Sequence, residues 1–121
     1  MRTHEDLVFD LDREEQNVTI SGKKYILTEL SGDERDRYLN DVGSRMRTSP
    51  DGKPAGIKDF NGMQAFLVSL SLKCTETGSP VSVSVKDIQK WPARLVARLF
   101  KSAKKLSALD EDENEEEEKN G

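Results

Sequence analysis

Few residues in this chain have types and spacings that support catalysis. Ser102 and Lys105 match the S-x-x-K pattern of acylated serine enzymes, but the accompanying S-D-N and K-T-G segments are missing. The single cysteine, Cys74, ends an apolar segment, where a thiol usually packs as a small apolar group. The sequence therefore does not predict an enzyme.

Metal ligands are equally scarce. A structural zinc site takes about four Cys or His ligands, and this chain has only Cys74 and His4. Residues 10–14 begin like a calcium-binding loop, but Glu15 stands where the turn glycine belongs and Ser21 where the bidentate glutamate belongs. We expect neither a metal ion nor a cofactor.

A stripe of basic residues is the first candidate for partner binding. Its members recur at about one helical turn, which places them on one face of a predicted helix over residues 92–109. Such a face suits phosphates or an acidic protein, or it is simply solvated and covers the core with its methylene groups. No aromatic residue interleaves with the charges, so we do not expect nucleic acid. This basic stripe comprises Arg94, Arg98, Lys101 and Lys105.

The second candidate is a predicted helix over residues 59–73 that is apolar on nearly its whole circumference. A helix apolar on all sides must be covered on all sides, and a small domain has limited material for that. Two interpretations stay open: a helix buried in the core, or one that partly faces another subunit or a client chain. The candidate contact residues are Phe60, Met63, Phe66, Leu67 and Leu70.

Local signals predict the elements that position these residues. Ser21-Gly22 separates two alternating, β-branched runs, which indicates a hairpin over residues 18–30. Ser31 and Glu34 form a capping box ahead of a helix, in which Asp41 and Arg45 are an i,i+4 ion pair. Residues 48–56 are predicted to form a loop. A further cap pair follows at Ser84 and Asp87, and Pro92 can occupy the first turn of the last helix.

Composition divides the 121 residues into three segments. Residues 1–17 form a polar arm, 18–109 a single small domain, and 110–121 a tail whose eight acidic residues and one lysine give a charge of −7. The tail has too few apolar side chains to offset its ordering entropy, so we expect it to be disordered. The predicted fold is a mostly helical α+β domain: an N-terminal β-hairpin, three or four helices and this acidic tail.

The compartment follows from what the sequence lacks. One cysteine permits no intramolecular disulfide and fits a reducing environment. No segment has the roughly 18 apolar residues that cross a bilayer, and no secretory signal is recognisable. We expect a cytosolic protein without a membrane partner.

The order of these segments resembles the tail assembly chaperones of long-tailed bacteriophages. The resemblance covers residues 16–118. It lies in the order of the segments and in their polar or apolar character, and it includes no catalytic signature. It rests on the hairpin and cap of residues 18–35, the apolar run 60–73, the segment Ile88-Gln89-Lys90-Trp91-Pro92-Ala93-Arg94-Leu95-Val96 with Leu99-Phe100, and the acidic tail.

The resemblance implies a function. Proteins of this family bind the tape measure protein, a very long, apolar, helical chain, and keep it soluble while tail-tube subunits polymerise around it. They act in the host cytoplasm and are absent from the mature virion. Self-association is expected, because coating a long client favours contacts between neighbouring copies.

Many members of the family are also made in a longer form by ribosomal frameshifting, and the extension recruits the major tail protein. Codons for Glu118, Lys119 and Asn120 permit the slippery heptamer A-AAA-AAC, which makes these residues the candidate frameshift position.

Two alternatives come from other functional classes. One is a small nucleic-acid-associated regulator that uses the basic helix and is autoinhibited by the acidic tail. The other is a structural tail or head-completion protein that stays in the particle. Salt separates the first from a chaperone, because phosphate binding weakens with added salt whereas apolar binding persists.

Overall fold

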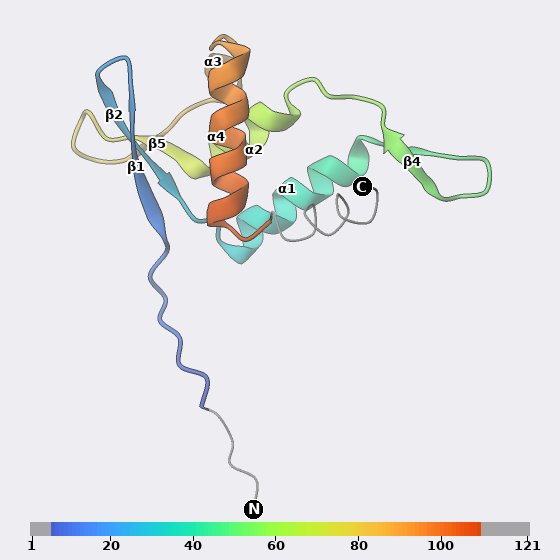
Figure 1. Cartoon of the computed structure of the whole chain (residues 1–121), viewed down its shortest axis with the longest axis horizontal. Coiled ribbons are helices and arrows are strands. Elements are labelled where there is room, and N and C mark those ends of the chain that lie inside the picture. Colours follow the sequence, from blue (N-terminus) through green and yellow to red (C-terminus); the bar gives the residue numbers. More distant parts are fainter. Residues whose placement is uncertain (1–5, 110–121) are drawn as a thin grey trace, which may run out of the picture.

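The computed structural model of the chain describes residues 6–109 (Figure 1). The predicted tail 110–121, with the candidate frameshift position Glu118, Lys119 and Asn120, lies outside the described residues, and so does His4. Residues 6–14 have no regular secondary structure and run away from the body of the molecule (Figure 1). Within the described part the chain forms an α+β fold in which an N-terminal hairpin precedes the helices.

The hairpin is confirmed and belongs to a larger sheet. Strand β1 (Glu15–Ile20) pairs antiparallel with β2 (Lys23–Thr28), and both turn residues between them, Ser21 and Gly22, have positive φ. Two positive φ angles suit the right-handed twist of a tight hairpin. β1 begins inside the predicted arm, three residues before Val18. The described sheet continues in the order β1-β2-β5-β6, through β5 (Leu72–Cys74) and β6 (Val81–Ser82).

The capping box at the start of the first helix is also confirmed. In α1 (Gly32–Ser44), the Ser31 hydroxyl accepts from the Glu34 amide at 3.1 Å, and the Glu34 carboxylate accepts from the Ser31 amide at 2.9 Å. Two orphan amides at the helix start are thereby satisfied.

The predicted loop over residues 48–56 is instead a small hairpin. β3 (Met46–Thr48) pairs with β4 (Pro54–Ile57) in a separate two-stranded sheet. The prediction of a turn within this segment is correct, since Gly52 has a φ of +85°. The residues on either side of the turn, however, pair with each other. Proline is tolerated there because an edge strand does not need every amide.

A helix was predicted over residues 59–73, and both predicted ends are wrong. Helix α2 spans Met63–Ser71, and the chain passes directly into strand β5, which pairs with Tyr25–Leu27 of β2. Gly62 has a φ of +76°, which is outside the helical range, so α2 begins only at the next residue, Met63. The continuous apolar run is explained by burial: first on a helix against the core, then on a strand inside the sheet. The helix content is therefore lower than predicted.

The last two helices follow their predicted caps. In α3 (Val85–Gln89) the Ser84 hydroxyl accepts from the Asp87 amide at 3.2 Å. Pro92 is the N-cap of α4 (Ala93–Leu106), where its missing amide hydrogen has no cost. Helices α2 and α4 and the sheet enclose the core, whose most buried members include Leu27, Leu67, Val68, Leu72, Ile88, Leu99 and Ala103.

Candidate interaction surface

An open apolar hollow lies where the N-terminal ends of α2 and α4 meet α3. Its volume is about 390 Å³, and Gln64 and Gln89 are polar residues on its wall. Phe60 stands at this hollow with 66% of its surface exposed, which is unusual for so large an aromatic residue. A concave apolar surface with few polar groups is typical of sites that take apolar partners. The apolar lining consists of Phe60, Met63, Ala65, Trp91, Ala93 and Val96.

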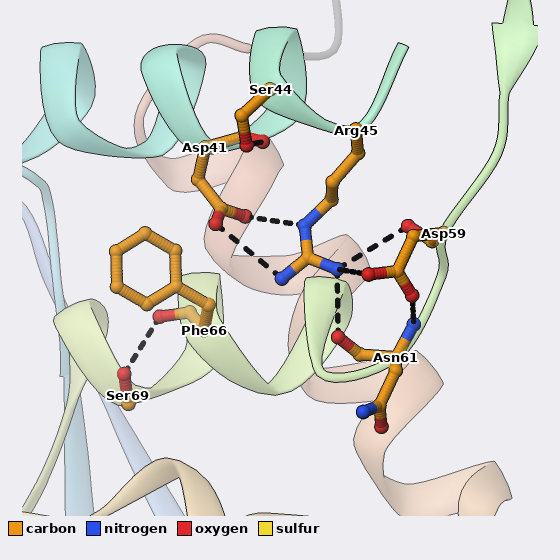
Figure 2. A network of polar contacts seen from close by, with 7 residues as sticks. All are labelled: Asp41, Ser44, Arg45, Asp59, Asn61, Phe66 and Ser69. Carbon is orange, nitrogen blue, oxygen red and sulfur yellow. Dashed lines mark hydrogen bonds and ion pairs between the residues drawn. The ribbon is translucent and has the colours of Figure 1, made fainter. Parts of the chain in front are cut away.

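Arg45 holds the segment that carries Phe60 (Figure 2). Its Nη1 donates to the carbonyl oxygen of Asn61 at 2.7 Å and to that of Asp59 at 3.3 Å, and it lies 3.7 Å from the Asp59 carboxylate. These acceptors flank Phe60 in the chain, so one guanidinium fixes the backbone on both sides of the exposed ring. Arginine suits this role because its donors are arranged in a rigid fork.

Arg45 is itself oriented by Asp41, as predicted from their i,i+4 spacing. Its Nε donates to Oδ2 of Asp41 at 2.8 Å, one helical turn back in α1 (Figure 2). This hydrogen bond is the largest influence on the guanidinium and raises the pKa of Arg45, with the charges of Asp41 and Asp59 adding to it. The cation is thus permanently charged where it binds the loop.

A second link ties the same loop to α3. Nε2 of Gln89 donates to Oδ1 of Asn61 at 3.1 Å, and the Asn61 amide donates to the Asp59 carboxylate at 2.9 Å. Gly62 sits against Gln89, because a Cβ added at Gly62 would lie 3.3 Å from Nε2 of Gln89. Phe60 is therefore presented by a segment held from α1 and from α3, which reduces the ordering cost of binding a partner.

The far wall of the hollow is built by Trp91. Its ring meets the ring of Tyr25 edge to face, with centroids 6.0 Å apart and planes at 79°. Tyr25 lies in β2, so the sheet supports this wall from behind. The geometry is one that aromatic pairs prefer, and it leaves Trp91 half-buried.

The predicted apolar contact residues divide between surface and core. Phe60 and Met63 line the hollow, and Phe66 is half-buried in a different, shallow depression beside Glu34. Leu67 is fully buried and Leu70 is 9% exposed, so both are part of the core in this structure. Most residues of α2 are therefore buried within the single chain.

Sequence reasoning missed Trp91, Ala93 and Val96 as members of this surface. Phe60 and Trp91 lie about thirty positions apart, and only the packing of α2 against α3 and α4 brings them together. No local pattern in the sequence links these positions.

The basic stripe forms one exposed face of α4. Arg94, Arg98, Lys101 and Lys105 are all exposed, as their spacing predicted. Lys104 differs from them: it is 4% exposed, and its ammonium lies 5.1 Å from the centre of the Phe100 ring. The Phe100 ring in turn meets Tyr38 of α1 edge to face.

Comparison with solved structures decides what this fold is. The structure of the bacteriophage HK97 tail assembly chaperone matches with a TM-score of 0.51 and 21% sequence identity, over 78% of this chain and 85% of that one. The chain has the fold of a phage tail assembly chaperone. Neither a comparison with protein-family models nor one with curated proteins finds a match.

Two further properties concern the part of the chain that the structure describes. Across residues 6–109, no helix has the length and apolar character to cross a membrane. In the same range, no three His, Cys, Asp or Glu side chains gather where they could hold a metal ion.

Proposed function

We propose that this protein is a phage tail assembly chaperone that binds the tape measure protein and keeps it soluble while the tail tube polymerises. It acts by reversible binding rather than by catalysis, in the host cytoplasm, and leaves before the virion is complete. The fold supports the assignment to this class. The position of Phe60 supports the binding site. Phe60 is 66% exposed, lies at an apolar hollow, and belongs to a loop whose backbone Arg45 holds.

The binding mode follows from the shape of the surface. A tape measure protein is long, helical and apolar, and a helix places apolar side chains on one face at intervals of three and four residues. One such side chain fits the hollow between Phe60 and Trp91, and its neighbours contact the exposed ring of Phe60. Each contact is small, so affinity for a long client comes from many copies binding along it.

The basic stripe of α4 keeps a coated client in solution. Four exposed cations on one face add charge that opposes aggregation of an apolar complex. A longer form, with an extension beginning near Glu118, would connect the same domain to the major tail protein. The test of that form is the mass of the products made from the natural gene.

Co-expression with the tape measure protein of the same phage tests the chaperone function. We expect the client to be soluble with the natural chain and to precipitate with Phe60→Ser. Val81→Ser is the matched control, since Val81 is also exposed, at 53%, but lies on β6 away from the hollow. A client that stays equally soluble with Phe60→Ser would refute the site, and one that is insoluble even with the natural chain would refute the function.

One observation favours a second function. The four basic side chains of α4 are exposed together, as a phosphate-binding face requires. A nucleic-acid-associated regulator predicts binding that weakens steeply between about 50 and 200 mM salt. Binding to an apolar client persists over the same range.

A further inference from the structure

Among the large apolar side chains in the described part of the chain, those of the N-terminal arm are the most exposed. Leu7, Val8, Phe9 and Leu11 are 78%, 87%, 84% and 100% exposed. They lie in residues 6–14, which leave the body without regular structure (Figure 1). Such a concentration of apolar surface on one short segment marks a contact site rather than ordinary surface scatter.

The arm has the pattern of a peptide that docks in an extended form. Side chains alternate between the two sides of an extended chain, so Leu7, Phe9 and Leu11 share one side. In the same extended form, Val8 and Asp10 lie on the other side. One side of the arm is therefore wholly apolar over three successive positions.

The hollow around Phe60 is an apolar surface that suits such side chains. Its lining is mostly apolar, and Phe60 and Trp91 provide two aromatic surfaces. The charges agree as well. Asp6, Asp10 and Asp12 stand among the apolar residues of the arm, whereas the exposed Arg94 follows Ala93 at the rim of the hollow.

The arm and the hollow lie at opposite ends of α4. Glu14, at the base of the arm, lies with Lys105 and Leu106 around one depression, whereas Ala93 and Val96 line the hollow. Ala93 and Lys105 are separated by about 18 Å of helix. Leu11 is three residues from Glu14 and reaches only about 10 Å from it. Leu11 therefore cannot reach Ala93 in the hollow of its own molecule, so the three apolar side chains of the arm cannot all enter that hollow.

The base of the arm is bound to the body of the molecule, so the distance that the arm can span is measured from a fixed point. Arg13 forms an ion pair with Glu34 at 3.3 Å, and the Glu29 amide donates to the Glu14 carbonyl at 2.8 Å. These contacts hold the end of the arm on the body while the apolar residues beyond it extend outward.

We propose that the arm of one copy docks in the Phe60–Trp91 hollow of a second copy of this chain. Leu7, Phe9 and Leu11 supply the apolar contacts, and the neighbouring acidic residues of the arm face the basic stripe of α4. This contact gives the self-association expected from the sequence a specific interface, and it requires no client. When a client is present, arm and client compete for one surface.

Trp91 gives a direct measurement, because it is the one tryptophan of the chain and lines the hollow. We expect its emission maximum to shift to longer wavelength on dilution, in step with a fall in mass seen by analytical ultracentrifugation. A full-length variant with Leu7→Ser, Phe9→Ser and Leu11→Ser should show the long-wavelength emission and the lower mass at every concentration. Its circular dichroism should match that of the natural chain.

Val8→Ser is the matched control, since Val8 points to the other side of the arm. It should associate like the natural chain, whereas Phe9→Ser alone should weaken association by roughly tenfold or more. Equal weakening by both substitutions would contradict docking through one side. An emission shift that does not change with concentration would place the arm in its own hollow and overturn the proposal.

Cross-linking tests the pairing directly. In a Cys74→Ser background, one protein carries Asp10→Cys and the other Ala93→Cys. When the two proteins are mixed under mild oxidation, a disulfide should form between them. It should form faster than the disulfide in a control mixture, in which Val81→Cys replaces Ala93→Cys. A synthetic peptide of residues 6–13 should suppress this disulfide. Equal rates for the two pairs would overturn the docking, and neither experiment contains a tape measure protein, so the proposed function is tested separately.

Discussion

Arg45 donates a 2.7 Å hydrogen bond to the backbone carbonyl of Asn61, joining the end of α1 to the loop that presents Phe60. The contact connects residues sixteen positions apart in the chain. Together with the bond to Asp59, it holds the backbone on both sides of the exposed Phe60. The side chain of Arg45 is only 14% exposed, so its bonds to the loop are partly shielded from water.

Replacing Arg45 with lysine should loosen this loop. A lysine keeps the charge but cannot bind Asp41 and both backbone carbonyls with one planar group. We expect a loss of about 1–2 kcal/mol in unfolding free energy and faster amide hydrogen exchange for residues 59–62. Arg47→Lys, at an exposed neighbour in β3, is the control and should change neither. Unchanged exchange in Arg45→Lys would mean that other contacts hold the loop.

Gly62→Ala and Gly43→Ala should have opposite effects on stability. Gly62 has a φ of +76°, and a Cβ added there would lie 3.3 Å from Nε2 of Gln89. An alanine is therefore strained and crowded, and we expect a loss of about 1–2 kcal/mol in unfolding free energy. Gly43 lies in α1 with free space around it, and alanine there should add about 0.5–1 kcal/mol. Chemical denaturation measures both. A stabilising Gly62→Ala would be inconsistent with the backbone described here.

A charge at Leu67 should unfold the protein, whereas the same charge at Phe60 should not. Leu67 is fully buried, so Leu67→Asp places an unpaired carboxylate in the core and should cost more than about 4 kcal/mol. Phe60 is mostly exposed, and Phe60→Asp should change the unfolding free energy by less than about 1 kcal/mol. Thermal unfolding distinguishes the two. Leu67 thus does not serve to test client binding, which Phe60 does.

Tyr38 should make stability fall at high pH. Burial, with a smaller contribution from Asp41, raises the pKa of its phenol above 10.0 in the folded protein. The unfolded chain therefore releases this proton first, and the contribution present below pH 10 is lost as the pH rises through the folded pKa. In a Tyr25→Phe variant, tyrosinate absorbance should show one transition above the normal range. A transition at or below pH 10 would show that Tyr38 is not buried as described.

Local chemistry made much of this fold predictable. The Ser21-Gly22 turn, the Ser31–Glu34 capping box, the Ser84 cap and the Asp41–Arg45 pair each depend on residues a few positions apart, and all appear in the structure. The fold class followed from them.

What failed depended on contacts between distant segments. Residues Leu72–Cys74 continue the apolar run of α2, and only pairing with β2 makes them a strand. Phe60 was predicted to lie on a helix, but Gly62, with a φ of +76°, places the start of α2 after it. The hollow itself was not predictable, since it combines residues from the ends of α2, α3 and α4.

No loop separates α2 from β5, because the helix ends at Ser71 and the strand begins at Leu72. The Ser71 hydroxyl donates to the Thr28 carbonyl at 2.7 Å and is fully buried, which locks the junction to β2. The two ends of α2 are therefore held differently. Its C-terminal end is bonded to a strand of the sheet, whereas Met63 at its N-terminal end lines a hollow that is open to solvent.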